Sequence, residues 1–344
     1  MPDQWGSRLD PWLIDESDFY ELEKHADQMA FLIRYAILAP SSHNTQPWSF
    51  RVTRDGVEVY PDYSRRCTVA DPSDRELLMS IGTSITNFCV AAAHFGFEPT
   101  VLYQDRSEQT LPAALIAVRE TCAPPAGLRR LFPAIQERHT NRVPFEPREI
   151  DSSALTELNE FVGSHSSFVQ FVVPGDRDRA ADLIARADRV LMASSAFRGE
   201  LAGWLRSNSS QTGDGMCADG FGIPDPLAPA TPWFLRRFDV GALQAKHDRA
   251  LVEHCAGLIV VTAEDDRVSL IRAGEALEML LLLLTRLGVQ YSFVNSPIEV
   301  DTLRSELWSM IRSPHPPQLL LRIGYATTVA RPQPRRDAAT ALVR

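Results

Sequence analysis

Cysteine and basic charge are both scarce in this sequence. The chain of 344 residues has five cysteines, none of them in a C-x-x-C pair. Zinc frameworks usually need such pairs, and disulfide scaffolds need a denser set of cysteines. The formal net charge is -9 at pH 7, whereas general binders of nucleic acid or membrane surfaces need basic faces. The composition therefore predicts no zinc site, no nucleic-acid partner and a reducing, cytoplasmic location.

Long apolar runs and targeting signals are also missing. The most apolar run, residues 279–284, is far shorter than the ~20 residues that a membrane span needs. Residues 1–5 have neither the basic start nor the apolar stretch of a signal peptide. Hydrophobic residues make up 44% of the chain, which is ordinary for a globular protein. We therefore expect a soluble chain with no membrane partner, long enough for one large domain or two ordinary ones.

Three common catalytic signatures are absent as well. There is no G-x-S-x-G elbow, and Ser42 and His43 are neighbours, from which no base geometry can be inferred. His247 and His254 are not at the spacing of metal ligands on one helix face. Residues 213–222 are rich in glycine but match neither the dinucleotide fingerprint nor the phosphate loop. A serine hydrolase and a metalloenzyme are therefore disfavoured.

The most distinctive stretch that is present is residues 39–48, which read APSSHNTQPW and are called the serine loop below. Residues 25–38 before it have helical periodicity, and residues 48–52 after it alternate like a strand. Pro40 and Pro47 bias the residues that precede them away from helical conformation. The loop offers hydroxyls, an amide and backbone N–H groups that could read the edge of a planar ligand. It could equally be a connection in which serine and asparagine only cap and turn.

Two parts of the chain repeat one pattern. The helix predicted over residues 75–95 contains Gly82 and ends at Gly96, and Gly274 and Gly288 frame a later helix with the same spacing. Each helix is followed by a strand and then by a proline-led apolar strand, over residues 101–104 and 112–116 in the first copy and 291–294 and 317–321 in the second. Three features in the same order favour an internal duplication, although two amphipathic helices could also match by coincidence.

The duplication predicts two halves, residues 17–123 with the serine loop and residues 124–336. Pro124 and Pro125 mark the junction. The second half contains an insertion at about residues 207–248, whose polar, glycine-rich first part predicts a mobile lid. Further helices are expected over residues 128–137, 153–162, 178–206 and 302–310, and further strands over residues 57–60, 113–119, 168–173 and 257–262.

Two other clusters could bind a ligand. Arg138, Thr140 and Arg142 lie close together, and Arg335 and Arg336 follow near the end of the chain. The guanidinium fork gives several donors to one phosphate, although a single arginine more often forms a surface ion pair. Residues 295–299 precede a predicted helix, where unpaired backbone N–H groups could bond a ring nitrogen or a developing anion. The same turn could also be a plain N-cap.

Together and in this order, the serine loop, the arginine cluster and the 295–299 turn resemble the FMN-dependent nitroreductase superfamily. More narrowly, the chain resembles the Acg-type subgroup, in which two nitroreductase-like halves are fused in one polypeptide. The matching segments span roughly residues 31–336. The resemblance implies an α+β, nitroreductase-like fold with the halves arranged as a pseudo-dimer. It also implies FMN as cofactor, NAD(P)H as possible electron donor, a small-molecule substrate, and a monomer or a homodimer of this chain.

The resemblance also assigns roles to particular residues. Four of them would form the loop that a partner subunit donates in the usual homodimer: Pro40, Ser41, Ser42 and Asn44. Three would surround the FMN phosphate and ribityl chain: Arg138, Thr140 and Arg142. Three would lie along the isoalloxazine, where a backbone N–H faces the reactive N5: Pro297, Ile298 and Glu299. Arg335 and Arg336 would complete the phosphate site, and Arg198 would lie near the pyrimidine edge.

This sequence departs from the family pattern in ways that bear on function. Val300 stands where the family often has glycine, and the second half has only Ser164–Ser167 where a complete serine loop would lie. The first half has no arginine cluster before its serine loop, so we expect one FMN per chain. The resemblance implies an oxidoreductase that uses flavin N5 to pass electrons from NAD(P)H to nitroaromatic or quinone-like acceptors. Because Acg-type proteins carry a lid, the alternative is a flavin-binding, sequestering protein with little reductase turnover.

Overall fold

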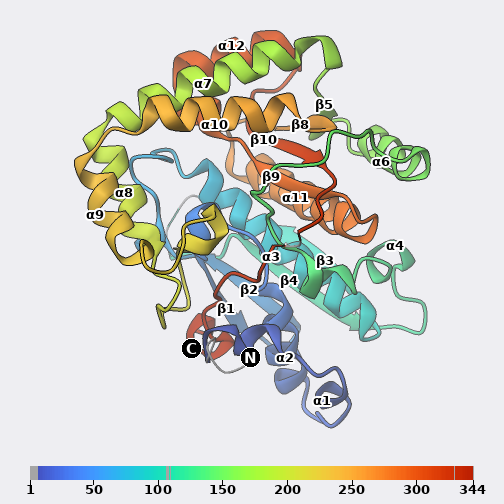
Figure 1. The fold of residues 1–344 in the computed structure, drawn as a ribbon. Helices are drawn as coiled ribbons and strands as arrows, with labels where there is room; N and C mark the ends of the chain where they lie inside the picture. Colours follow the sequence, from blue (N-terminus) through green and yellow to red (C-terminus); the bar gives the residue numbers. More distant parts are fainter. Residues whose placement is uncertain (1–6, 106–107, 109, 329, 344) are drawn as a thin grey trace.

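The structure is a computed structural model that describes residues 7–105, 108, 110–328 and 330–343 (Figure 1). The predicted absence of a signal peptide concerns residues 1–5, which lie outside the described residues. Two four-stranded antiparallel sheets flank a central pair of long helices, α3 (Arg75–His94) and α11 (Arg267–Arg286). The mixed α+β architecture predicted from the sequence is confirmed.

The two sheets have the same topology. The first has the order β1-β2-β4-β3, and the second has the order β5-β8-β10-β9. If the four strands of each sheet are numbered as they follow in the chain, both sheets have the spatial order 1-2-4-3. The first consists of β1 (Trp48–Val52), β2 (Gly56–Pro61), β3 (Phe97–Tyr103) and β4 (Ala114–Glu120). The second consists of β5 (Val169–Phe171), β8 (Gly257–Thr262), β9 (Gln290–Phe293) and β10 (Pro317–Gly324). In both, the long helix connects the second strand to the third, which supports the internal duplication.

Two glycines set the crossing of the long helices. A Cβ atom built on Gly82 of α3 would lie 2.0 Å from the carbonyl oxygen of Ile271, and one built on Gly274 of α11 would lie 2.0 Å from that of Met79. Only glycine lets the two backbones approach this closely. The equivalent glycines that suggested the repeat in the sequence therefore face each other across one interface.

The second sheet packs a helix layer on each face. In β8, Ile259 and Val261 belong to the core around α3 and α11, whereas Leu258 and Val260 belong to a second core. This alternation follows the two-residue period of a strand. The second core is closed by three helices, which form the upper layer in Figure 1: α7 (Arg177–Ala193), α10 (Gly241–Glu253) and α12 (Asp301–Ile311).

Several predicted elements are divided or shortened in the structure. The helix predicted over residues 128–137 is two short helices, α4 (Ala126–Arg129) and α5 (Ala134–Glu137), because Pro133 interrupts it. The helix predicted over residues 178–206 breaks at Ser194, whose side chain caps the new helix α8 (Ser195–Trp204) by accepting a hydrogen bond from the Phe197 N–H. The remaining helices are α1 (Ser17–Tyr20), α2 (His25–Ala36), α6 (Ser152–Ser164), α9 (Thr231–Arg237) and α13 (Ala338–Ala341).

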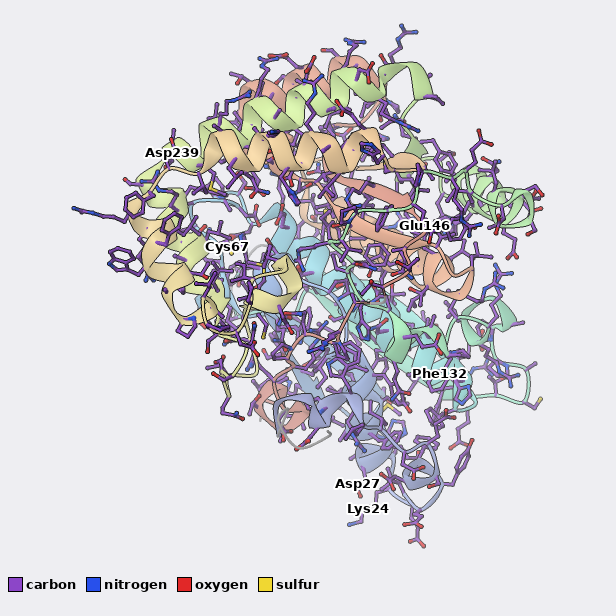
Figure 2. The ribbon with its side chains drawn as sticks, in the orientation of Figure 1. Lys24, Asp27, Cys67, Phe132, Glu146 and Asp239 are labelled. Carbon is purple, nitrogen blue, oxygen red and sulfur yellow. The ribbon has the colours of Figure 1, made fainter. Side chains whose placement is uncertain are left out.

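The insertion is shorter than predicted at its C-terminal end. Asp239 lies at the outer edge of the molecule between α9 and α10 (Figure 2), and its side chain accepts a hydrogen bond from the Gly241 N–H at the start of α10. Because α10 packs on α7, residues 241–248 belong to the helix layer of the second sheet. The part of the insertion outside this layer is therefore residues 207–240. Within it, β7 (Met216–Cys217) pairs in parallel with β6 (Leu205–Arg206), which directly precedes the insertion.

One helix in the described part of the chain, α3, is long and apolar enough to cross a membrane by length and composition. Within its most apolar window, 94% of the residues are buried inside the protein. The helix therefore has the surroundings of a core helix, packed between α2, α11 and the first sheet.

Candidate functional site

A cavity of about 290 Å³ lies where the two halves and the insertion meet. The first half contributes the serine loop and one face of α3, and the second half contributes the arginine cluster, α11, β9 and the turn that follows β9. Nine of the residues predicted from the sequence line it: Pro40, Ser41, Ser42, Asn44, Arg138, Thr140, Arg142, Glu299 and Arg335.

The serine loop is held in a strained conformation. His43, Asn44 and Gln46 have φ values of 49°, 55° and 52°, a left-handed region that costs a residue with a side chain about 1–2 kcal/mol. Such strain persists only where surrounding contacts fix the backbone, and it is typical of functional sites. Here the Asn44 Nδ2 donates to the carbonyl oxygens of Gly215 and Pro334 at 2.8 and 2.9 Å.

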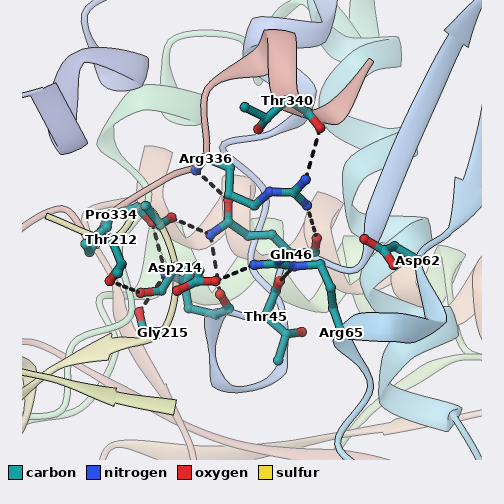
Figure 3. A network of polar contacts seen from close by, with 12 residues as sticks. Thr45, Gln46, Asp62, Arg65, Thr212, Asp214, Gly215, Pro334, Arg336 and Thr340 are labelled. Carbon is teal, nitrogen blue, oxygen red and sulfur yellow. Dashed lines mark hydrogen bonds and ion pairs between the residues drawn. The ribbon is translucent and has the colours of Figure 1, made fainter. Parts of the chain in front are cut away.

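The insertion and the C-terminal tail together clamp the serine loop (Figure 3). Gln46 Nε2 donates to the Gly213 carbonyl at 2.8 Å, and Gln46 Oε1 accepts from the Arg336 N–H at 2.9 Å. Arg65 donates to the Thr45 carbonyl at 2.6 Å and pairs with Asp214. The base of the predicted lid, residues 213–215, is therefore tied to the loop that it would cover.

Arg138 is committed to the protein itself. Its side chain is 2% exposed, and its two terminal nitrogens donate to the Tyr291 hydroxyl at 2.7 Å and to the Leu38 carbonyl at 2.9 Å. Its Nε forms an ion pair with Glu278 Oε1 at 3.2 Å. Burial raises the pKa of Glu278 to about 7, and the charge of Arg138 opposes that rise. The guanidinium that the sequence placed at a phosphate is thus a buried connection between the halves.

Arg335 is engaged in a similar way. Its guanidinium donates to Asn44 Oδ1 at 3.0 Å and to the carbonyls of Leu38 and Ala39 at 2.9 and 3.1 Å. Burial, reinforced by the charge of Arg138, lowers the pKa of Arg335 to about 9. Arg335 therefore holds the serine loop in place, with both terminal nitrogens directed at protein oxygens.

Arg142 differs from both. Its guanidinium carbon lies 4.6 Å from the ring centre of Phe221, and one nitrogen is 3.9 Å from the Met216 sulfur. Within residues 7–105, 108, 110–328 and 330–343, it forms no ion pair with a carboxylate. Burial lowers the pKa of Arg142 to about 10, so the side chain is still a cation at pH 7. With Thr140 it also lines an adjoining hollow of about 410 Å³, and it is the arginine best placed to receive an anion.

Four predicted residues do not line the cavity. Arg198 donates to the carbonyls of Met192, Ala193 and Leu235, so its guanidinium connects α7, α8 and α9. Arg336 donates to the carbonyls of Gln46 and Thr340 and belongs to the clamp. The remaining two are buried beneath the turn, where the Ile298 N–H bonds to the Asn295 carbonyl: Pro297 and Ile298.

Several lining residues escaped the sequence prediction. Glu76, Met79, Ser80 and Thr83 face the cavity from α3. They recur at the i, i+3, i+4, i+7 spacing of one helix face, and three of them are polar although most of the helix is buried. That polar stripe was the available signal. Met216 and Phe221 come from the insertion, and no local pattern in the sequence tells which of its side chains turn inward.

Comparisons with known proteins find sequence relatives that are named as nitroreductases. No family model matches it. Three relatives match most of the chain. Putative NAD(P)H nitroreductase Rv3131 of Mycobacterium tuberculosis is 28% identical over 320 residues, 90% of this chain and 88% of the relative. Putative NAD(P)H nitroreductase Acg of the same organism is 27% identical over 320 residues, which cover 90% of this chain and 92% of the relative. Probable NAD(P)H nitroreductase PigM of Serratia sp. is 25% identical over 328 residues, which cover 88% of this chain and 90% of the relative.

Two solved structures also align with the chain. The FMN-dependent nitroreductase NfnB of Mycobacterium smegmatis, in complex with NADPH, is 15% identical, with a TM-score of 0.36 over 60% of this chain and 93% of that one. A nitroreductase-like structure from Anabaena variabilis is 10% identical, with a TM-score of 0.44 over 92% of this chain and 91% of that one. The sequence relatives alone confirm the predicted resemblance: the chain is related over nine tenths of its length to proteins named as nitroreductases, and Acg is one of them.

Proposed function

We propose that this protein is an NAD(P)H-dependent oxidoreductase that binds FMN in the cavity between its halves and reduces nitroaromatic or quinone-like acceptors. One observation carries the proposal: the cavity is walled by the three segments that define the resemblance, and it holds a half-buried arginine, Arg142, that pairs with no carboxylate of the described residues. The names of the sequence relatives supply the reaction class.

The residues present fit a ligand with one anionic end and a planar, heteroatom-rich end. Arg142 and Thr140 would hold the phosphate, since Arg138 and Arg335 already donate to protein oxygens. The serine loop and the 295–299 turn would lie along the ring system, which when bound supplies two-electron chemistry at N5. The apolar side chains of Met79, Leu277 and Leu319 would keep water from that part of the cavity.

We further propose that each chain forms one such site from both of its halves, residues 17–123 and 124–336, arranged as an internal pair. The carbonyl of Leu38 in the first half accepts hydrogen bonds from Arg138 and Arg335 of the second half. Glu76 and Glu299 bring carboxyl groups to the same cavity from different halves. Neither half alone contains a complete wall.

A second function, flavin sequestration with little turnover, is favoured by the clamp on the insertion. Met216 and Phe221 reach the cavity from a segment whose base is bonded to the serine loop at Asn44 and Gln46. A lid fixed in this way would slow the exchange of ligand and the approach of large acceptors.

The purified protein distinguishes these functions. We expect a yellow protein that releases FMN on denaturation, is bleached by NADH or NADPH under nitrogen, and regains its colour with menadione or nitrofurazone. Bleaching that takes many minutes, or a reduced form that menadione does not reoxidise, would favour sequestration. A colourless protein that takes up no FMN when titrated with it, or one that releases FAD, would contradict the proposed cofactor.

A further inference from the structure

Four acidic side chains gather where α3, α7 and the 295–299 turn meet. Glu76 and Glu299 line the cavity, and the charges of Asp71 and Asp188 also act on Glu299. Arg75 is the cation that acts on Asp71, Glu76 and Glu299, whereas Arg189 and Asp248 act on Asp188. The four carboxyls are not arranged as a metal site, because no group of three or more acidic, histidine or cysteine side chains in the described ranges could hold an ion.

Arg75 does not pair directly with either cavity carboxyl. Its guanidinium donates to the Ile298 carbonyl at 3.3 Å and to Gln318 Oε1 at 3.4 Å. Asp71 accepts hydrogen bonds from the backbone N–H groups of Arg75 and Leu77 at 2.9 and 3.0 Å. Burial raises the pKa of Asp71 above its ordinary value, and those two hydrogen bonds together with the charge of Arg75 oppose the rise.

Glu76 and Glu299 are thus two carboxyls that line one cavity, together with Arg138, Arg142 and Arg335. The charges of Asp71 and Asp188 act on Glu299, and the charge of Arg75 opposes them. Glu76 accepts hydrogen bonds from Asn295 and Ser42. Glu299 Oε2 is shut off from solvent and has no hydrogen-bond partner in the part of the chain that the structure describes. Burial, followed by the charge of Asp71, raises the pKa of Glu76 to about 7, and burial and the charge of Glu76 raise the pKa of Glu299. Two such groups cannot both ionise without a large cost.

We propose that Glu76 and Glu299 share one proton at neutral pH and donate it to the acceptor that is reduced in the cavity. This inference rests on the proposed function. Reduction of a quinone consumes a hydride equivalent, which NAD(P)H supplies through the bound cofactor, and one further proton. An O–H bond of the carboxyl pair breaks as an O–H bond forms on the quinone oxygen, and water then returns a proton to the pair. Nitro compounds need the same second proton when they are reduced to nitroso compounds and water.

The test compares an acceptor that consumes a proton with one that does not. Menadione takes up a hydride and a proton, whereas ferricyanide takes up electrons alone. In the double variant Glu76→Gln, Glu299→Gln, we expect menadione reduction to fall about 10²-fold, the usual contribution of a positioned general acid. Ferricyanide reduction by the same FMN-saturated samples is the reference rate, because Glu299 belongs to the turn that would lie along the ring system. The ratio of the menadione rate to the ferricyanide rate should therefore fall about 10²-fold. With menadione the parent rate should fall as pH rises through about 7, and the double variant should lose this dependence.

The matched control is Glu275→Gln. Glu275 is a glutamate of α11 whose pKa burial also raises to about 7, but it bonds to Tyr103 and does not line the cavity. This variant should reduce both acceptors at parent rates. The shared-proton proposal is wrong if the double variant also reduces menadione at the parent rate. It is also wrong if the rates of menadione and ferricyanide reduction fall equally while the variant still binds cofactor.

Infrared titration of the protein separates this proposal from the proposed function. The band to follow is the carbonyl stretch of the protonated Glu76–Glu299 pair. It should persist near pH 7 in the parent and in Glu275→Gln, and it should be missing from the spectrum of the double variant. A parent protein that shows this band but oxidises no NAD(P)H with ferricyanide would contradict the reductase function and leave the shared proton supported. A band that is already absent from the parent near pH 6 would overturn the shared proton.

Discussion

Asn44 and Gly215 are joined by two hydrogen bonds, although 171 residues separate them. The Asn44 Nδ2 donates to the Gly215 carbonyl at 2.8 Å, and the Gly215 N–H donates to the Asn44 carbonyl at 3.2 Å. One bond fixes a residue with φ of 55°, and the other fixes a glycine with φ of 75°. The strained loop and the base of the insertion therefore hold each other in place, so that a movement of the insertion would require the loop to change as well.

We expect Gly215→Ala to loosen this clamp. A Cβ atom at that position would lie 2.5 Å from the Trp204 carbonyl and 2.9 Å from Arg206, in a backbone conformation that disfavours side chains. The variant should lose more than the ~1–2 kcal/mol of a left-handed alanine alone and should exchange bound ligand faster. Gly222→Ala is the control, because Gly222 also has a positive φ, of 70°, but open space around its Cβ position. Denaturant unfolding and FMN exchange rates check the comparison, and equal effects of the two substitutions would contradict the clamp.

Arg142 and Arg138, two of the arginines that line the cavity, should respond differently to substitution. Arg142→Ala removes the cation without a carboxylate partner, so FMN binding should weaken roughly ten- to hundredfold, as expected for the loss of ~1.5–3 kcal/mol of charge-assisted bonding. Protein stability should change little. Fluorescence titration with FMN measures this effect, and an unchanged affinity would remove Arg142 from the proposed phosphate site.

Arg138→Ala should act mainly on stability. It leaves Glu278 buried without its partner and leaves the Leu38 carbonyl with one hydrogen bond fewer. Breaking a buried pair in this way costs about 3–5 kcal/mol. Glu278→Gln in the same chain should recover part of that loss, because it removes the unpaired charge. Denaturant unfolding of the single and double variants is the measurement, and a single variant as stable as the parent would contradict the structural role.

The sequence predicted the segments of the site better than the roles of their side chains. The serine loop, the arginine cluster and the 295–299 turn could be recognised because their residues are close together in the chain. The difference between Arg138 and Arg142 could not, because it depends on Tyr291 and Glu278, which lie more than a hundred residues away. A local pattern shows that an arginine is present but does not show which acceptors the fold brings to it.

The strands and long helices were predictable for a related reason. Gly82 and Gly274 punctuate two apolar helices, and the structure places both at one helix crossing. The breaks at Pro133 and Ser194 lay inside patterns that still read as continuous helices. Pro133 lacks the N–H that a continuous helix needs, and the Ser194 hydroxyl caps a new helix. Each therefore interrupts a helix that the apolar periodicity predicts to continue.

The helix crossing gives a prediction about stability. Gly82→Ala places a methyl group 2.0 Å from the Ile271 carbonyl, so the long helices must move apart, and overpacking of this kind costs about 1–3 kcal/mol or more. Gly203→Ala in α8 is the control, because its Cβ would meet nothing within 4 Å and alanine favours a helix by up to about 1 kcal/mol. Thermal and denaturant unfolding should show opposite signs for the two variants, and a neutral Gly82→Ala would contradict the close crossing.

The last prediction concerns the pH dependence of stability. Burial raises the pKa of Glu275 from 4.5 to about 7, and the hydrogen bond from Tyr103 only partly opposes the rise. The folded protein therefore binds this proton at pH values where the unfolded chain has released it. The stabilising contribution is complete below about pH 4.5 and is lost as pH rises through about 7. In Glu275→Gln the free energy of unfolding should consequently decline less between these two pH values than in the parent. Urea titrations at closely spaced pH values measure the two slopes, and parallel curves would show that Glu275 is ionised alike in the folded and unfolded states.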